Sequence, residues 1–303
     1  MDLRQLRALI AIADRGSFSA AAASLHTVQS NVSGHVARLE AELGVQLVDR
    51  QAGQLTEEGH AVVDRGRRIV AELDAAVADV AALRHDVVGT VRIGMIGTTA
   101  RWLAPLVIDR TASSHPKVKL VIGDGTSATL EPHLASGALD AAVLNLPQIN
   151  PDLVERPLFD EDLVLVVPAD HPLAARGQVQ VSDLARLRLL LPAPGSAFRE
   201  EIDEACVPAG VSLTPRAELD GVRLMASLTL SGYGPSILPA TALSGALEGF
   251  SRVSVEGLHR RTVGLVLRRR SRPSAPARAV LAVLDEVVAA NIDPRSGLHR
   301  PST

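Results

Sequence analysis

Residues 18–40, FSAAAASLHTVQSNVSGHVARLE, contain four consecutive alanines followed by a run of small polar side chains. Residues 20–23 predict a short helix that another helix crosses closely, because larger side chains would hold the two backbones apart. The turn at His26 and Thr27 leads into a helix over 28–43, and Gly44 follows it as a C-cap. The stretch therefore predicts two helices joined by a tight turn.

One more helix precedes this pair, since residues 3–14 carry apolar side chains at helical spacing and Gly16 ends the pattern. Three short helices with a tight turn before the last one form a helix-turn-helix, whose final helix can lie in the major groove of DNA. Its N-terminal half is crowded with Gln29, Ser30, Asn31, Ser33, Gly34 and His35. Gln and Asn amides suit adenine edges. A plain helical bundle with a polar surface fits the same residues, so physics alone leaves both interpretations open.

A longer segment resembles the signature of the LysR-type transcriptional regulators. It reads GSFSAAAASLHTVQSNVSGHVARLEAELGVQLVDR over residues 16–50 and continues with LTEEG at 55–59. The positions that match the family pattern are Gly16, Ser17, Phe18, Ala21, Ala22, Leu25, Gln29, Ser33, Leu39, Glu40, Leu43, Gly44, Leu47, Arg50, Leu55, Thr56 and Gly59. The resemblance favours the DNA-binding interpretation.

The resemblance covers nearly the whole chain and implies an α plus α/β protein in three parts. We expect a winged helix-turn-helix over 1–58, a linker and dimerisation helix over 59–88, and an effector-binding domain over 89–303 that is similar to periplasmic binding proteins. The expected lobes are about 89–161 with 265–303, and about 162–264. A small-molecule effector would bind between them and alter promoter binding by a dimer or tetramer.

The DNA-reading part departs from the family pattern in charge. The chain has Val48 where Phe is common, the short neutral wing QAGQ at 51–54, and Gly34 at an often basic position. Residues 1–60 hold five arginines against seven acidic side chains, a formal charge of −2. We therefore expect weak, salt-sensitive binding by one domain and a need for several domains on one DNA. The candidate DNA contacts are Gln29, Ser30, Asn31, Ser33, His35, Arg38 and Arg50.

Residues 56–86 predict one long helix with Thr56 as N-cap and Glu57 and Glu58 in its first turn. Apolar side chains recur along it at heptad-like spacing. The resulting stripe consists of Val62, Ile69, Leu73, Val80 and Leu83, with the small Ala76. A second copy of the chain is the simplest partner for this stripe, and a lone amphipathic helix lying on a domain is the alternative.

From Gly89 onward, Val-rich strand patterns alternate with helical patterns, and all 18 prolines occur in this part. The alternation predicts two similar α/β halves, each with a mainly parallel sheet, and a late return strand near 261–269. Ligands of such folds bind at the carboxyl ends of the strands, here between the two lobes.

The resemblance places the effector between the lobes, at side chains that follow predicted strands. These candidates are Thr98, Thr99, Ser127, Ser196 and Tyr233. Hydroxyl groups and helix N-termini favour a carboxylate or another small anion, although each residue alone also fits a cap or a turn. Arg101, Arg199 and Arg223 are candidate charge partners.

Other functions find little support in the sequence. A net charge of −3 argues against general coating of nucleic acid, and one cysteine excludes an internal disulfide and a multi-thiolate metal site. We find no catalytic arrangement and expect no enzyme activity, metal or cofactor. GDGTSA at 123–128 matches a dinucleotide fingerprint only superficially, on the second strand of its lobe. The basic run RRRSRP at 268–273 is expected to be a solvated surface.

With no signal peptide and no membrane-spanning run, we expect a cytoplasmic protein. One alternative stays open: a small-molecule binding protein or nucleotide-dependent enzyme whose N-terminal helices serve only in assembly.

Overall fold

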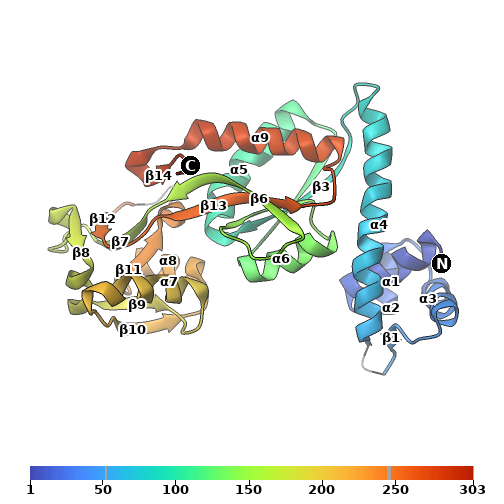
Figure 1. Ribbon diagram of the computed structural model, residues 1–303, viewed down its shortest axis with the longest axis horizontal. Coiled ribbons are helices and arrows are strands. Elements are labelled where there is room, and N and C mark those ends of the chain that lie inside the picture. Colours follow the sequence, from blue (N-terminus) through green and yellow to red (C-terminus); the bar gives the residue numbers. More distant parts are fainter. Residues whose placement is uncertain (52, 244–246, 303) are drawn as a thin grey trace.

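The computed structural model describes residues 1–51, 53–243 and 247–302. A small helical domain carries the N-terminus, and a long helix runs from it along the first of two α/β lobes (Figure 1). This arrangement confirms the predicted fold class of a winged helix-turn-helix, a linker helix and a two-lobed domain.

The N-terminal domain is a winged helix-turn-helix. Its elements are α1 Leu3–Arg15, α2 Phe18–Ser24, α3 Gln29–Leu43, β1 Val48–Asp49 and β2 Gln54–Leu55. Gly16 and Gly44 end α1 and α3 in the left-handed conformation, where glycine has no steric penalty. Ala21 and Ala22 are buried and α2 contacts both α1 and α3, so the alanine run serves close helix crossing as predicted.

Helix α4, Glu57–Ala82, joins this domain to the lobes. Thr56 caps it by accepting a hydrogen bond from the Gly59 N–H at 3.0 Å, as the sequence predicts. The helix ends four residues before the expected 86, and His85 beyond it takes a positive φ of 62°.

Lobe I is built on a six-stranded sheet with strand order β14-β6-β13-β5-β3-β4. Its elements are β3 Gly89–Ile96, α5 Gly97–Ser114, β4 Val118–Gly125, α6 Ser127–Ser136, β5 Ala141–Asn145, β6 Leu153–Glu161, β13 Arg261–Arg268, α9 Ala275–Asn291 and β14 Leu298–His299. Strands β3, β4 and β5 are parallel, so their carboxyl ends share one edge of the sheet.

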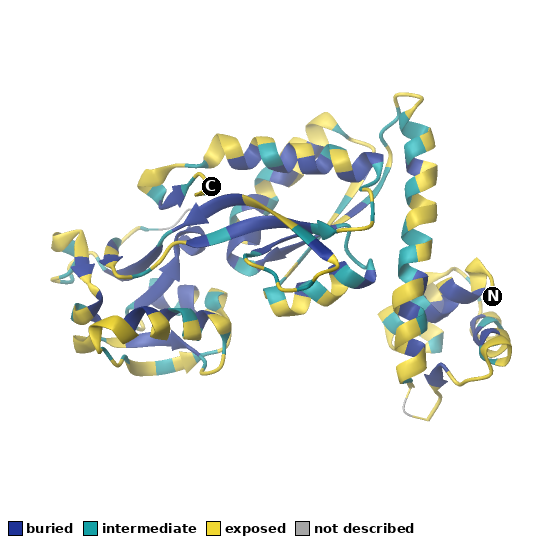
Figure 2. Cartoon of the chain, viewed as in Figure 1, coloured by how far each residue is buried: buried dark blue, intermediate teal, exposed yellow. Residues whose placement is uncertain are grey.

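Lobe II has a second six-stranded sheet, with strand order β10-β9-β11-β7-β12-β8. Its main elements are β7 Leu163–Pro168, β8 Gln178–Gln180, β9 Arg188–Pro192, α7 Ala197–Cys206, β10 Thr214–Leu219, α8 Val222–Leu230, β11 Ser236–Pro239 and β12 Phe250–Glu256. Figure 2 shows buried residues along the strands of both sheets, which form the two cores.

The structure corrects several sequence expectations. Both sheets are mixed rather than mainly parallel, because β13 runs against β5 and β7 runs against β11 and β12. The return strand β13 enters the lobe I sheet at Arg261, four residues before the expected lobe boundary at 265. Helix α5 starts at Gly97, so Thr98 and Thr99, which were expected to follow the first strand of the lobe, lie in its first turn.

The chain passes between the lobes twice, and side chains at the two crossing points bind each other. Glu161 ends β6 and Arg261 begins β13, and the two side chains form a buried ion pair of 2.5 Å. The Thr241 hydroxyl donates to the other Glu161 carboxylate oxygen at 2.7 Å. Both carboxylate oxygens of Glu161 are therefore paired, and its contacts join the end of β6 to the start of β13 and to Thr241.

Candidate DNA-reading and effector sites

The exposed face of α3 carries the side chains predicted to read DNA. Gln29, Ser30 and Asn31 are exposed, while Ser33 and His35 are half-buried. The Ser19 hydroxyl donates to Gln29 Oε1 at 3.0 Å, and Asn31 Nδ2 donates to the Thr27 hydroxyl at 2.9 Å. Each amide still retains a free donor and a free acceptor lone pair, which a bidentate contact with adenine requires.

Two arginines flank this face. Arg38 donates to His35 Nδ1 at 2.9 Å and remains exposed. Arg50, also exposed, lies 3.4 Å from Glu40 at the start of the wing. The other Glu40 oxygen accepts from the backbone N–H of Leu47 at 2.9 Å. Glu40 therefore anchors the wing to α3 and positions Arg50 beside it.

Further basic residues near the wing are already engaged. Arg67 forms a 2.5 Å ion pair with Asp14, and Arg68 Nε donates to the Asp64 carbonyl at 3.3 Å. These contacts reduce the positive charge that α4 offers to DNA.

The exposed stripe of α4 begins later than the sequence suggests. Val62 packs against the winged-helix core, and Gly66 faces Leu6 of α1. Large apolar side chains stay exposed farther along the helix, at Ile69, Leu73, Val77 and Val80, and at its C-cap Leu83. Val77 is 73% exposed. The predicted stripe omitted it because it falls between the heptad positions that guided the prediction.

Three strand ends of lobe I bring polar groups to one edge of its sheet. Thr98 and Thr99 follow β3, Ser127 follows β4, and Asn145 ends β5. The Asn145 N–H donates to the Ser127 hydroxyl at 3.3 Å. The hydroxyl of Thr99 and the side-chain oxygen of Asn145 are buried and have no hydrogen-bond partner in the described chain. Sequence reasoning missed Asn145, whose only signal was its place at a strand end.

An ion pair joins this edge to lobe II. Arg223, in the first turn of α8, lies 2.5 Å from Asp124 near the end of β4. The Arg223 side chain also covers Gly97, where a β-carbon would stand 3.1 Å from Arg223 Cδ. Arg223 was a candidate charge partner, whereas Asp124 was not singled out.

The remaining predicted effector residues lie outside this group. Ser196 caps α7, accepting from the Arg199 N–H at 3.3 Å and donating to the Ala193 carbonyl at 2.7 Å. Arg199 is held by the Pro192 carbonyl at 3.1 Å and by two carboxylates, which raise the pKa of its guanidinium. Tyr233 is exposed beyond the far end of α8 from Arg223. Ser196 and Arg199 are thus bound within lobe II, and Tyr233 lies at the surface.

Cys206 is the one cysteine of the sequence and is only 2% exposed at the end of α7. Burial raises the pKa of its thiol, with a smaller contribution from Asp203. Since the thiolate is the reactive form, this thiol is held in an unreactive state.

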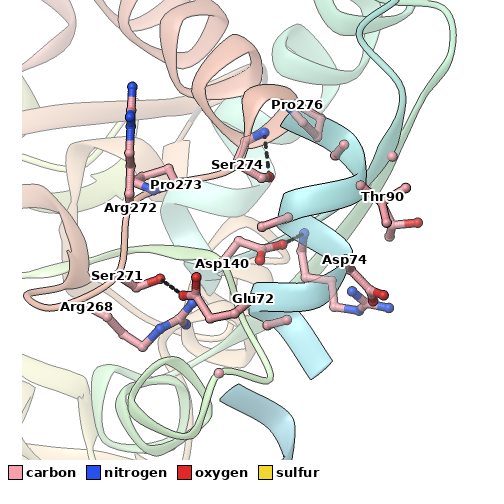
Figure 3. A pocket seen from close by; sticks show the side chains of 18 of the residues that line it. Glu72, Asp74, Thr90, Asp140, Arg268, Ser271, Arg272, Pro273, Ser274 and Pro276 are labelled. Atoms are coloured by element: carbon pink, nitrogen blue, oxygen red, sulfur yellow. Dashed lines mark hydrogen bonds between the residues drawn. The ribbon is translucent and has the colours of Figure 1, made fainter. Parts of the chain in front are cut away.

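A pocket of about 370 Å³ separates α4 from lobe I (Figure 3). Two α4 carboxylates bind the start of α9 and the segment before it: Glu72 accepts from the Ser271 hydroxyl at 2.7 Å, and Asp79 accepts from the Ala275 N–H at 2.7 Å. Across the pocket, Asp140 accepts from the Arg92 N–H at 2.7 Å. The joint between linker helix and lobe is thus polar and incompletely filled.

Two arginines of the basic run at 268–273 bind backbone carbonyls: Arg268 is half-buried, whereas Arg269 is exposed, as expected for a solvated surface. Arg268 donates to the carbonyls of Leu134 and Leu139, and Arg269 donates to those of Pro151 and Leu153. GDGTSA forms the turn from β4 to α6, where a β-carbon on Gly125 would stand 2.6 Å from Thr129 Oγ1. Its second glycine therefore serves the chain's own packing.

Within the described ranges, no group of three or more potential metal-ligating His, Cys, Asp or Glu side chains comes together. Among the helices described there, none is long and apolar enough to span a bilayer.

Comparison with known families matches both parts of the chain. Residues 3–60 match the bacterial regulatory helix-turn-helix protein of the lysR family, and residues 84–289 match the LysR substrate binding domain.

Individual proteins are similar over almost the full length. A probable hydrogen peroxide-inducible genes activator of Mycobacterium leprae is 32% identical, over 93% of each chain. Full-length OxyR from Pseudomonas aeruginosa, with a cysteine-to-aspartate substitution, has a TM-score of 0.77 at 28% identity, covering 95% of this chain and 94% of that one. Full-length CbnR complexed with its target DNA has a TM-score of 0.67 at 26% identity, covering 96% and 99%.

Proposed function

Because the chain belongs to the LysR family of transcriptional regulators, we propose that it binds promoter DNA as a dimer or tetramer and responds to a small organic anion between its lobes. Residues 1–58 would read DNA, residues 59–88 would link and dimerise, and residues 89–303 would bind the effector. We also propose that the protein is cytoplasmic and catalyses no reaction.

The exposed polar face of α3 beside the wing is the observation that carries the DNA-binding part. Gln29 and Asn31 project from the first turns of a helix whose inner face, with Val32 and Val36, is fully buried. Burial of the inner face fixes which side chains can reach base edges in the major groove. The DNA-bound CbnR relative supports the same use of this fold.

The exposed apolar stripe of α4 supports self-association. Val77 and Leu83 are 73% and 83% exposed, and covering a contiguous apolar stripe with a second copy removes it from water. Dimerisation also compensates for the formal charge of −2 on residues 1–60, because two weak DNA contacts on one molecule act together.

The effector is proposed to bind without covalent chemistry. Although relatives carry names that refer to hydrogen peroxide, this sequence has one cysteine and cannot form a disulfide within the chain. That thiol is buried and its pKa is raised, which disfavours oxidation. Polar groups at the lobe I strand ends, next to the N-terminus of α5, favour a small anion instead.

The effector would act by shifting the relative orientation of the lobes, and α4 would carry that change to the DNA-reading domain. The hydrogen bonds of Glu72 and Asp79 attach the linker helix α4 directly to lobe I. A ligand shifts this equilibrium only if it binds one lobe arrangement more tightly than the other.

The test is selection of genomic DNA fragments by the purified full-length protein at two salt concentrations. The proposal predicts an enriched, partly palindromic motif whose half-sites lie about one helical turn, or a multiple of it, apart. Recovery of no enriched motif at either salt concentration would contradict it.

A further inference from the structure

The two lobes are joined beside the N-terminus of α5 by the ion pair between Arg223 and Asp124. We propose that Arg223 is the residue that binds the anionic group of the effector, and that Asp124 occupies this guanidinium while the site is empty. The inference rests on the proposed function and adds to it the anion-binding residue and an internal competitor.

The Arg223–Asp124 pair lies where the two lobes meet. Arg223 lies at the start of α8 in lobe II, and Asp124 lies near the end of β4 in lobe I, 2.5 Å away. Helix α8 also packs against α5. A charge in this place contacts both lobes at once, so exchanging Asp124 for a ligand changes what holds the lobes together.

The surroundings of Arg223 already suit an anion. Its side chain lies on Gly97, the first residue of α5, where a β-carbon would meet Arg223 Cδ and Nε at 3.1 Å. Ile96 provides no side-chain cap for α5, so the positive end of the helix dipole adds to the guanidinium charge.

A second, independent observation is a buried hydroxyl in the same turn. Thr99 is 0% exposed, and its Oγ1 has no hydrogen-bond partner in the described chain. A buried polar atom without a partner is unfavourable, and a ligand oxygen reaching the first turn of α5 would supply that partner.

The other candidate arginines do not meet these conditions. Arg199 is bound by Asp203, Glu218 and the Pro192 carbonyl within lobe II. Arg101 lies exposed on α5 and forms no ion pair with lobe II within the described ranges. Arg223 alone among the three is paired across the lobes.

The pair is also weak enough to exchange. Arg223 and Asp124 side chains are 65% and 38% exposed, and exposed ion pairs add little stability because water screens both charges. A free anion that contacts Arg223, the α5 N-terminus and Thr99 together can therefore displace Asp124.

The experiment titrates the full-length protein with sodium sulfate against sodium chloride at constant ionic strength. Sulfate serves as the probe, and the fluorescence of Trp102 is the readout. Trp102 is the one tryptophan of the sequence, lies on α5, and packs edge-on against Phe159 at 5.1 Å between ring centroids.

We expect Asp124→Asn to bind sulfate roughly two- to five-fold more tightly than the wild type, because the competitor is removed. Arg223→Gln should bind it at least about ten-fold more weakly. The matched control is Glu286→Gln, which removes the carboxylate of another exposed lobe I pair, with Arg110, and should bind sulfate as the wild type does.

The exchange of both charges, Asp124→Arg with Arg223→Asp, separates ligand binding from lobe attachment. It retains an ion pair between the lobes but removes the cation from α8, so sulfate binding should be lost while circular dichroism shows an unchanged fold. The inference would be overturned if the double variant still bound sulfate. It would also be overturned if Asp124→Asn and the wild type bound sulfate equally well, or if neither of these two gave a saturable response. The DNA selection does not depend on sulfate, so success there with failure here would reject the role of Arg223 alone.

Discussion

The backbone carbonyl oxygen of Leu47 occupies the space that a β-carbon on Gly59 would need. Leu47 precedes the wing and Gly59 lies in the first turn of α4, so this approach joins the DNA-reading domain to the linker helix. The same carbonyl accepts the Thr56 N–H at 3.0 Å. The residues of LTEEG thus form a close backbone contact that requires glycine.

Replacing Gly59 with alanine should destabilise the N-terminal domain by at least about 2 kcal/mol, because the overlap is with backbone that cannot rotate away. Amide hydrogen exchange of the full-length protein would show faster exchange in α1 to α4. Gly34→Ala is the control, since its nearest neighbour is an Arg38 side-chain atom at 3.8 Å; alanine there should stabilise α3 by up to about 1 kcal/mol. Equal exchange rates in the two variants would refute the steric explanation.

Treatment with hydrogen peroxide should leave Cys206 reduced and DNA binding unchanged, because the thiol is buried and its pKa is raised. Peptide mass spectrometry would measure oxidation at Cys206, and fluorescence anisotropy would measure affinity for a selected fragment. The same protein unfolded in urea provides the control, in which the thiol should oxidise. Oxidation of the folded protein together with a change in affinity would show that the chain responds to peroxide.

Val77→Glu should dissociate the proposed dimer, because it puts a charge on the exposed α4 stripe. Sedimentation velocity should show a shift to monomer at micromolar concentration. Ala61→Glu introduces the same charge at an exposed site away from the stripe and should sediment as the wild type. An unchanged oligomer in Val77→Glu would rule out this stripe as the interface.

Asp140→Asn should stabilise the protein at neutral pH, since burial raises the pKa of the Asp140 carboxyl above its ordinary value of 3.8. A raised pKa in the folded state means that ionisation of Asp140 opposes folding as the pH rises through that pKa. Urea unfolding should therefore show a gain over the wild type at pH 7 and 8 that shrinks as the pH falls toward 4. A gain that does not vary with pH would point to packing instead.

Local patterns in the sequence were sufficient for the helices and for the parallel strands of lobe I. Gly16, Gly44 and Thr56 mark helix ends by backbone and capping chemistry that acts within a few residues, and the structure confirms all three. Strands β6, β8 and β12 were missed. Polar residues and Pro157 interrupt the apolar run of β6, which is stabilised by pairing with the distant β13.

The candidate site was harder to predict because it depends on contacts between the lobes. Thr98, Thr99 and Ser127 lie where parallel strands end, so topology alone brings them to one edge. Arg223 meets Asp124 only after the lobes are folded and joined, and no local spacing indicates that pair. Ser196 caps α7, one of the two roles that its place at a helix start allowed, and its role in effector binding stays a prediction.

The central claim is that α3 reads DNA bases, and the most direct test is the specificity ratio of Asn31→Ala. Affinities for a selected fragment and for the same fragment with its motif scrambled should be measured by anisotropy at one salt concentration. We expect the variant to lose about 1–3 kcal/mol on the selected fragment and almost nothing on the scrambled one. An equal loss on both fragments, or no loss on either, would contradict the claim that this face of α3 reads the operator.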